Sequence, residues 1–101
     1  MAIEGITITR RADDDDDGSG EYHAHIDGTK AIGRLTWVRR GDARAAEHTL
    51  VPREIGGRGV AAQLVDAMVA DAREQGFKIV PECSYVARKF AQNPQWSDVK
   101  A

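Results

Sequence analysis

The chain has 101 residues and a single cysteine, Cys83, so it cannot form a disulfide bond within itself. Nothing in the cysteine content therefore indicates an oxidising compartment, and we expect the protein in the cytoplasm. Residues 1–5 lack the basic start and the apolar stretch of a secretory signal. No apolar run approaches the ~20 residues that cross a bilayer, so no membrane partner is expected.

An excess of positive charge is also missing. The net charge is −2, and this gives no reason to expect a nucleic-acid partner. Five of the acidic residues form one run, Asp13–Asp17, and without them 14 basic residues face 11 acidic ones. The run lacks the spaced ligands and the distal glutamate of a calcium loop. A solvated hairpin tip is therefore favoured over a cation site.

The remaining composition is that of an ordinary soluble globular protein. Hydrophobic residues make up 42% of the chain and charged residues 30%. The length fits one domain, residues 1–101, that can bury its own core. We find no internal repeat and no linker long enough to separate two domains.

The first half of the chain predicts strands separated by turns. Segments rich in β-branched and aromatic residues alternate with glycine and aspartate. Asp27–Gly28 is typical of a tight hairpin turn. The alternation is imperfect near Gly33, a pattern that permits a β-bulge there. The four strands are expected at residues 2–11, 21–26, 30–40 and 44–51.

The second half changes to a helical period. Apolar residues at helical spacing predict a helix over residues 57–75, which Gly76 ends. A short strand over residues 77–80 stops at Pro81, and a short helix over residues 84–90 follows. Trp37 and Trp96 are expected to pack against the body.

A strand–helix–strand crossover makes the fourth and fifth strands parallel neighbours. The fold class is therefore α+β. We expect a mixed, mostly antiparallel five-stranded sheet, one long helix after a glycine-rich loop, and a short C-terminal helix.

The segment Gly56–Ala61 joins the fourth strand to the long helix and is rich in glycine. Glycines let the backbone approach a bulky group closely, and the free N–H groups of the helix point back into the turn. Such a turn forms a cradle for a phosphate or diphosphate. A plain strand-to-helix connection is the alternative interpretation, and this stretch alone does not decide between them.

Three stretches together resemble the GNAT acyltransferase superfamily, and in particular its small members with a single cysteine. They are HTLVP at residues 48–52, GGRGVA at 56–61 and IVPECSYV at 79–86. The superfamily turn usually reads Q/R-x-x-G-x-G/A, with Gly56 here at the Q/R position. That is a departure, although Arg53 and Arg58 are close enough in sequence to supply charge. The resemblance implies that acetyl-CoA is the cosubstrate and that an acetyl group moves to an unidentified amine.

The resemblance also implies a binding site. The fourth and fifth strands would separate, and the pantetheine arm of acetyl-CoA would lie between them. Its diphosphate would be held by backbone amides of the glycine-rich turn. Complete GNAT domains carry helices between their first two strands, whereas only the aspartate-rich turn is present here. The acceptor side is therefore expected to be open and to suit a protruding lysine or N-terminal amine. The implied cofactor-binding residues are Thr49, Leu50, Val51, Gly56, Gly57, Arg58, Gly59, Val60 and Ala61.

Cys83 and His48 are the catalytic candidates. Cys83 directly precedes the expected second helix, whose N-terminus would favour the reactive thiolate. It either accepts the acetyl group or only lines the pocket. His48 has a side chain suited to a general base near neutral pH, but it is equally a histidine that pins the strand by hydrogen bonds.

Three further side chains have two interpretations each. Tyr85 either protonates a leaving thiolate or covers the core with its ring. His23 and His25 share one strand face but have no third ligand nearby in sequence, so a surface pair is favoured and no metal site is expected.

A second class of function stays open. No glutamate stands out as a general base, and Gly56 lacks the side chain usual at its position. The chain would then be a non-catalytic module that binds or senses acyl-CoA. A pure interaction domain that uses its sheet edge is a weaker third reading.

Overall fold

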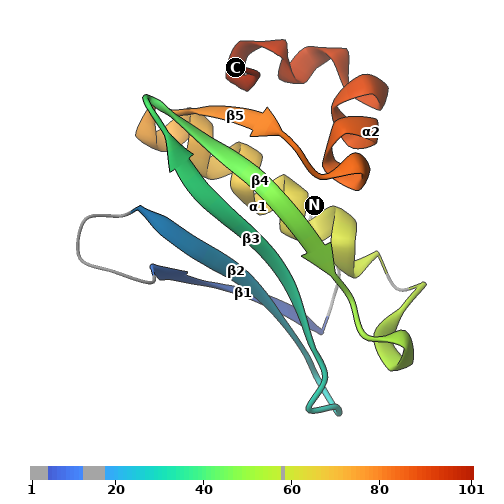
Figure 1. Cartoon of the computed structure of the whole chain (residues 1–101). Coiled ribbons are helices and arrows are strands. Elements are labelled where there is room, and N and C mark those ends of the chain that lie inside the picture. The colour runs from blue at the N-terminus through green and yellow to red at the C-terminus, as the bar shows by residue number, and fades with distance from the viewer. Residues whose placement is uncertain (1–4, 13–17, 58) are drawn as a thin grey trace.

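The computed structural model describes residues 5–12, 18–57 and 59–101 (Figure 1). Its five-stranded sheet has the order β1-β2-β3-β4-β5, the same as the order in sequence. Neighbouring strands from β1 to β4 are antiparallel, whereas β5 is parallel to β4. The expected α+β fold is confirmed. The elements are β1 (Ile6–Ala12), β2 (Ser19–Ile26), β3 (Ile32–Arg40), β4 (Ala43–Leu50), η1 (Arg53–Ile55), α1 (Val60–Gln75), β5 (Lys78–Pro81), α2 (Ser84–Gln92) and η2 (Pro94–Val99).

Helix α1 lies across one face of the sheet (Figure 1). Every second residue of β2 and β3 is buried toward it, and the apolar stripe of α1 closes the core from the other side. The opposite face of β1, β2 and β3 carries no helix in the described part of the chain (Figure 1). None of the described helices is long and apolar enough to cross a membrane. The central buried side chains include Leu35, Leu64, Val65, Met68, Ile79 and Val86.

Gly33 permits the close approach of α1 to the sheet. It pairs in regular register with Ala24, so the bulge that the sequence permitted does not occur at Gly33. A Cβ atom at Gly33 would lie 2.7 Å from Cγ1 of Val60, the first residue of α1. The glycine is needed because Val60 fills the space that a side chain would occupy, and this packing does not disturb the strand.

The irregularity of the sheet lies on β4. Thr36 pairs with His48, whereas the next residue, Trp37, pairs with Ala46. Glu47 is therefore the additional residue of a β-bulge, and the alternation of faces along β4 shifts at this point. Beyond the bulge the face of each β4 side chain follows its partner on β3.

Several element boundaries differ from those expected. Helix α1 begins at Val60 rather than at Gly57, because Gly57 and Gly59 both have φ of 76°, a left-handed conformation that does not continue a helix. Strand β5 begins at residue 78 and includes Pro81. Helix α2 runs two residues further than expected, to Gln92.

The expected structure at the two ends of the chain also differs from the observed one. The first strand begins at Ile6, and residues 2–4 of the expected strand lie outside the described residues, as does the expected hairpin tip at residues 13–17. The tail forms the short helix η2, where Trp96 is buried, as its expected packing role requires.

A buried carboxylate ties α1 to the far edge of the sheet. Asp71 of α1 is 6% exposed, and its oxygens accept hydrogen bonds from the Arg10 guanidinium at 2.7 and 3.1 Å and from the Tyr22 hydroxyl at 2.8 Å. Burial and the hydrogen bond to Asp71 raise the pKa of Tyr22 above its ordinary value, so the hydroxyl remains a donor. The helical pattern gave no sign of this cluster, because a lone aspartate on a helix usually faces solvent.

The packing at Gly33 predicts a double-mutant result. Gly33→Ala overpacks the contact with Val60 and should lower the free energy of unfolding by about 2 kcal/mol. Val60→Ala leaves a cavity and should cost about 2 kcal/mol by itself. The double variant should be more stable than the sum of the two losses by about 1 kcal/mol, because the new methyl group enters the vacated space. Urea unfolding followed by tryptophan fluorescence measures all three, and an unchanged stability of Gly33→Ala would contradict the contact.

Candidate functional site

The site begins where strands β4 and β5 separate. Their parallel ladder has four pairs and ends at Ala46 and Pro81. Proline has no N–H group to donate, so it cannot carry the ladder further. The chain then turns: the N–H of Glu82 donates to the Val80 carbonyl at 3.0 Å, and the N–H of Cys83 donates to the Ala46 carbonyl at 2.8 Å. Strand β4 continues past this point while β5 turns away into α2 (Figure 1). The two strands thus separate, as the resemblance implied.

Cys83 and Thr49 face each other across this gap. The Thr49 hydroxyl lies 3.5 Å from the Cys83 sulfur. Burial raises the pKa of the Cys83 thiol, but the Thr49 hydroxyl and the backbone N–H groups of Val86, Tyr85 and Thr49 outweigh it. The pKa of Cys83 therefore lies below its ordinary value. The first turn of α2 thus favours a thiolate at this position.

The glycine-rich turn leads from β4 to the N-terminus of α1. Gly59 is the N-cap residue and has no side chain to cap the helix, so the first N–H groups of α1, including those of Val60 and Ala61, are open to a ligand. Apart from its two neighbours in the chain, no described residue has an atom within 4 Å of the position that a Cβ atom would take at Gly57. This open, left-handed turn has the shape of an anion cradle. Arg58 lies outside the described residues.

Gly56 and Arg53, which precede this cradle, are also exposed. Gly56 directly follows the short helix η1 and has an extended backbone with φ of −68°. Arg53, one of the two arginines expected to supply charge, is exposed at the start of η1. Its position next to the turn is compatible with that expectation, which stays a prediction.

His48 is not brought into contact with Cys83. His48 pairs with Thr36 and is exposed on the sheet face away from α1, whereas Thr49 pairs with the buried Leu35 and points to the α1 side. No contact joins His48 to the thiol within the described part of the chain. Its role as a base therefore stays a prediction, and Cys83 is the candidate that lies at the gap.

The other candidates have structural partners. Tyr85 lies in the first turn of α2, where burial and the nearby Asp66 raise its pKa. His23 bonds to Glu21 at 2.7 Å, and His25 bonds to the Thr9 hydroxyl at 2.9 Å. The described residues contain no group of three or more potential ligands that could hold a metal ion.

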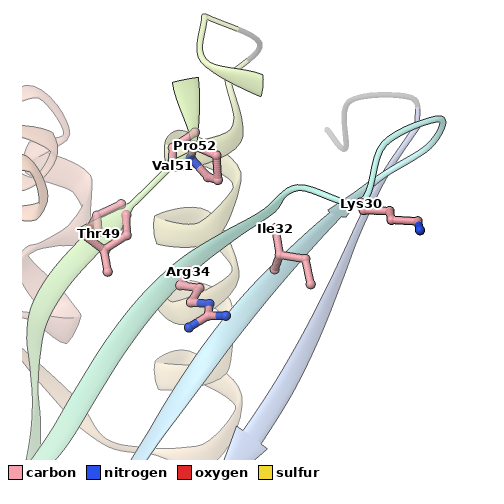
Figure 2. A pocket seen from close by; sticks show the side chains of 7 residues that line it. Lys30, Ile32, Arg34, Thr49, Val51 and Pro52 are labelled. Carbon is pink, nitrogen blue, oxygen red and sulfur yellow. The ribbon is translucent and has the colours of Figure 1, made fainter. Parts of the chain in front are cut away.

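A cavity of about 650 Å³ opens beside the gap, between the start of β3 and the end of β4 (Figure 2). One wall is apolar and includes Leu50, a large hydrophobic side chain that is 57% exposed. Thr49 lines the cavity and also contacts Cys83, so the cavity borders the residue that contacts the thiol. The sequence interpretation missed Lys30 and Arg34, which a stricter reading of alternate positions on the third strand would have grouped with Ile32. The lining residues are Lys30, Ile32, Arg34, Thr49, Leu50, Val51 and Pro52.

One family model matches most of the chain. Residues 21–99, which run from β2 through η2, match the model of the GCN5-related N-acetyltransferases. The chain belongs to the GCN5-related N-acetyltransferase family. No curated protein matches the sequence. The matched region includes the gap, the glycine-rich turn and Cys83.

The environment of Cys83 predicts its reactivity. The rate of alkylation by iodoacetamide, measured against pH, should have a midpoint below the value of about 8.5 for an ordinary cysteine. Thr49→Val removes the hydroxyl that lowers the pKa of the thiol, so the midpoint should rise and the rate at pH 7 should fall by about threefold. Thr36→Val is the control, because its hydroxyl has no hydrogen-bond partner among the described residues. Equal midpoints for Thr49→Val and the unmodified protein would contradict the assignment.

Proposed function

We propose that the chain binds acetyl-CoA in the gap between β4 and β5 and transfers its acetyl group to a primary amine. The observation that carries the proposal is the end of the ladder at Ala46 and Pro81, with a thiol of lowered pKa facing into the opening. Family membership supports the same reading, because the family is one of N-acetyltransferases.

Backbone groups are the main binding elements in this proposal. Strand β4 has no β5 partner in the ladder beyond Ala46, so the residues from Thr49 to Val51 can hydrogen-bond to the amides of the pantetheine arm. The diphosphate is placed at the turn of Gly57 and Gly59, where the first N–H groups of α1 point and where no side chain of the described residues blocks the approach. The departure at Gly56 matters less here, because main-chain atoms supply the contacts.

The proposed chemistry uses Cys83 as the nucleophile. Its thiolate attacks the carbonyl carbon of the thioester, a new carbon–sulfur bond forms, and the bond to the CoA sulfur breaks. CoA leaves as a thiolate and takes a proton. An unprotonated amine then attacks the S-acetyl group, loses its extra proton to solvent, and releases the Cys83 thiolate. The Thr49 hydroxyl stabilises that thiolate before and after each transfer.

Acetyl-CoA binding tests the first half of the proposal. Calorimetric titration should detect binding to the unmodified protein, and Gly57→Val should weaken it by about tenfold or more, because a side chain fills the cradle and hydrogen bonds to the charged diphosphate are lost. Gly41→Val is the matched control. Gly41 also has a positive φ, 61°, and open space around it, but it lies in the turn between β3 and β4.

Both valine variants strain the backbone to a similar degree, so thermal unfolding of the two should be comparable. Equal affinity for acetyl-CoA in the two variants would move the diphosphate away from the glycine-rich turn. Absence of any heat with the unmodified protein would overturn the proposal as a whole.

The covalent step gives a second test. Incubation with acetyl-CoA and no acceptor should add one acetyl group to Cys83, detected by peptide mass spectrometry. Cys83→Ala should lose this product and lower amine acetylation by more than about a hundredfold, because the nucleophile is gone. His48→Gln should still form the acetyl-cysteine, since His48 makes no contact with the thiol in the described structure. Full turnover by Cys83→Ala would instead indicate direct attack by the amine, and tight binding with no transfer to any amine would favour the non-catalytic module.

A further inference from the structure

We infer that the cavity between β3 and β4 is the acceptor subsite and that it selects an amine flanked by carboxylates, such as a lysine in an acidic peptide. This inference rests on the function proposed above and narrows its substrate class. Its starting point is the position of the cavity. Thr49 forms part of the cavity wall and its hydroxyl lies 3.5 Å from the Cys83 sulfur, so the cavity borders the residue that contacts the thiol.

The charge of the cavity is positive throughout. Among the described residues that line it, Lys30 and Arg34 are charged and none is acidic. Both are exposed, and neither forms an ion pair or a hydrogen bond with any other described residue. In Figure 2 Arg34 lies between Ile32 and the segment around Thr49, whereas Lys30 extends toward the outer rim.

Arg34 differs in this respect from three other arginines of the described chain. Arg10, Arg40 and Arg73 each form a salt bridge with a carboxylate, at 2.7, 2.6 and 3.0 Å. Arg34 presents the same planar group, which can bind a carboxylate through two parallel hydrogen bonds, but no such partner is present within the described chain. We therefore assign the carboxylate to the acceptor.

The shape of the cavity favours an extended chain over an enclosed metabolite. Its other wall is apolar and open, and Leu50 is largely exposed there. Apolar stems of neighbouring acceptor residues can pack on this wall while a charged end reaches Arg34. An acceptor rich in lysine and arginine would be repelled by the same two cations.

Another source of negative charge is acetyl-CoA itself, whose phosphates could approach Lys30 and Arg34. We place those phosphates at the glycine-rich turn instead, where free N–H groups of α1 point. Arg34→Gln separates the two assignments. Under our assignment it leaves acetyl-CoA affinity unchanged and acts only on the acceptor.

The test uses three capped peptides, each with a single lysine flanked by two glutamates, two glutamines or two arginines. Acetyl transfer gives kcat/KM, and fluorescence anisotropy gives peptide affinity with CoA present and absent. The kcat/KM of the glutamate peptide should exceed that of the glutamine peptide by about tenfold at low salt, and the difference should be smaller at high salt. Arg34→Gln should remove most of this preference and Lys30→Gln part of it. Arg11→Gln is the control, since Arg11 is exposed and unpaired among the described residues but lines no part of this cavity.

Equal binding and equal transfer for the glutamate and glutamine peptides would overturn the inference, as would a preference for the arginine peptide. A loss of acetyl-CoA affinity in Arg34→Gln would also overturn it, by assigning the cation to the cosubstrate. Each of these results leaves the heat of acetyl-CoA binding to the unmodified protein intact. Failure of the proposed function removes that heat, so the two failures are distinguishable.

Discussion

The site depends on one missing hydrogen-bond donor. Pro81 cannot continue the parallel ladder, so β4 and β5 pair over only four positions and then separate. The turn that follows is fixed by two backbone hydrogen bonds, and the second of them brings Cys83 against the Ala46 carbonyl. A proline at the end of a short strand thus both opens the sheet and sets the place of the thiol. Had β5 paired along the full length of β4, the backbone of Thr49 to Val51 would be sealed inside the sheet.

The bulge at Glu47 completes this arrangement on the other strand. Without the additional residue, every side chain beyond it would change faces, because the side-chain period of a strand is two. In the observed register Thr49 points toward the thiol, and Leu50 points to the opposite face with Arg34 as its partner on β3. The end of β4 therefore serves two sites at once: one face approaches Cys83, and the other contributes to the cationic cavity.

The order of strands and helices could be predicted from the sequence, because turn residues and changes of period mark each boundary. The glycine-rich turn and Cys83 were also identifiable, since both carry a local pattern. The position of the bulge could not be predicted, because a lone glycine in a strand, such as Gly33, looks the same whether the backbone is irregular or a helix packs closely on it. Two contacts, Thr49 with Cys83 and Asp71 with Tyr22, join residues that lie far apart in the chain. The cavity likewise brings Lys30 and Arg34 beside the end of β4. No local pattern in a single sequence reports such contacts.

Some charged side chains have a partner among the described residues and others have none. The uncovered face of the sheet explains this difference. A buried charge must find a partner at once, as Asp71 does with Arg10 and Tyr22, since desolvation of an unpaired carboxylate is costly. On the face away from α1 no such constraint acts, because water solvates Lys30 and Arg34. Unpaired cations there cost little stability, so this face can carry the cations of the proposed acceptor site. A fold with a helix over this face would have forced each of them to pair within the chain.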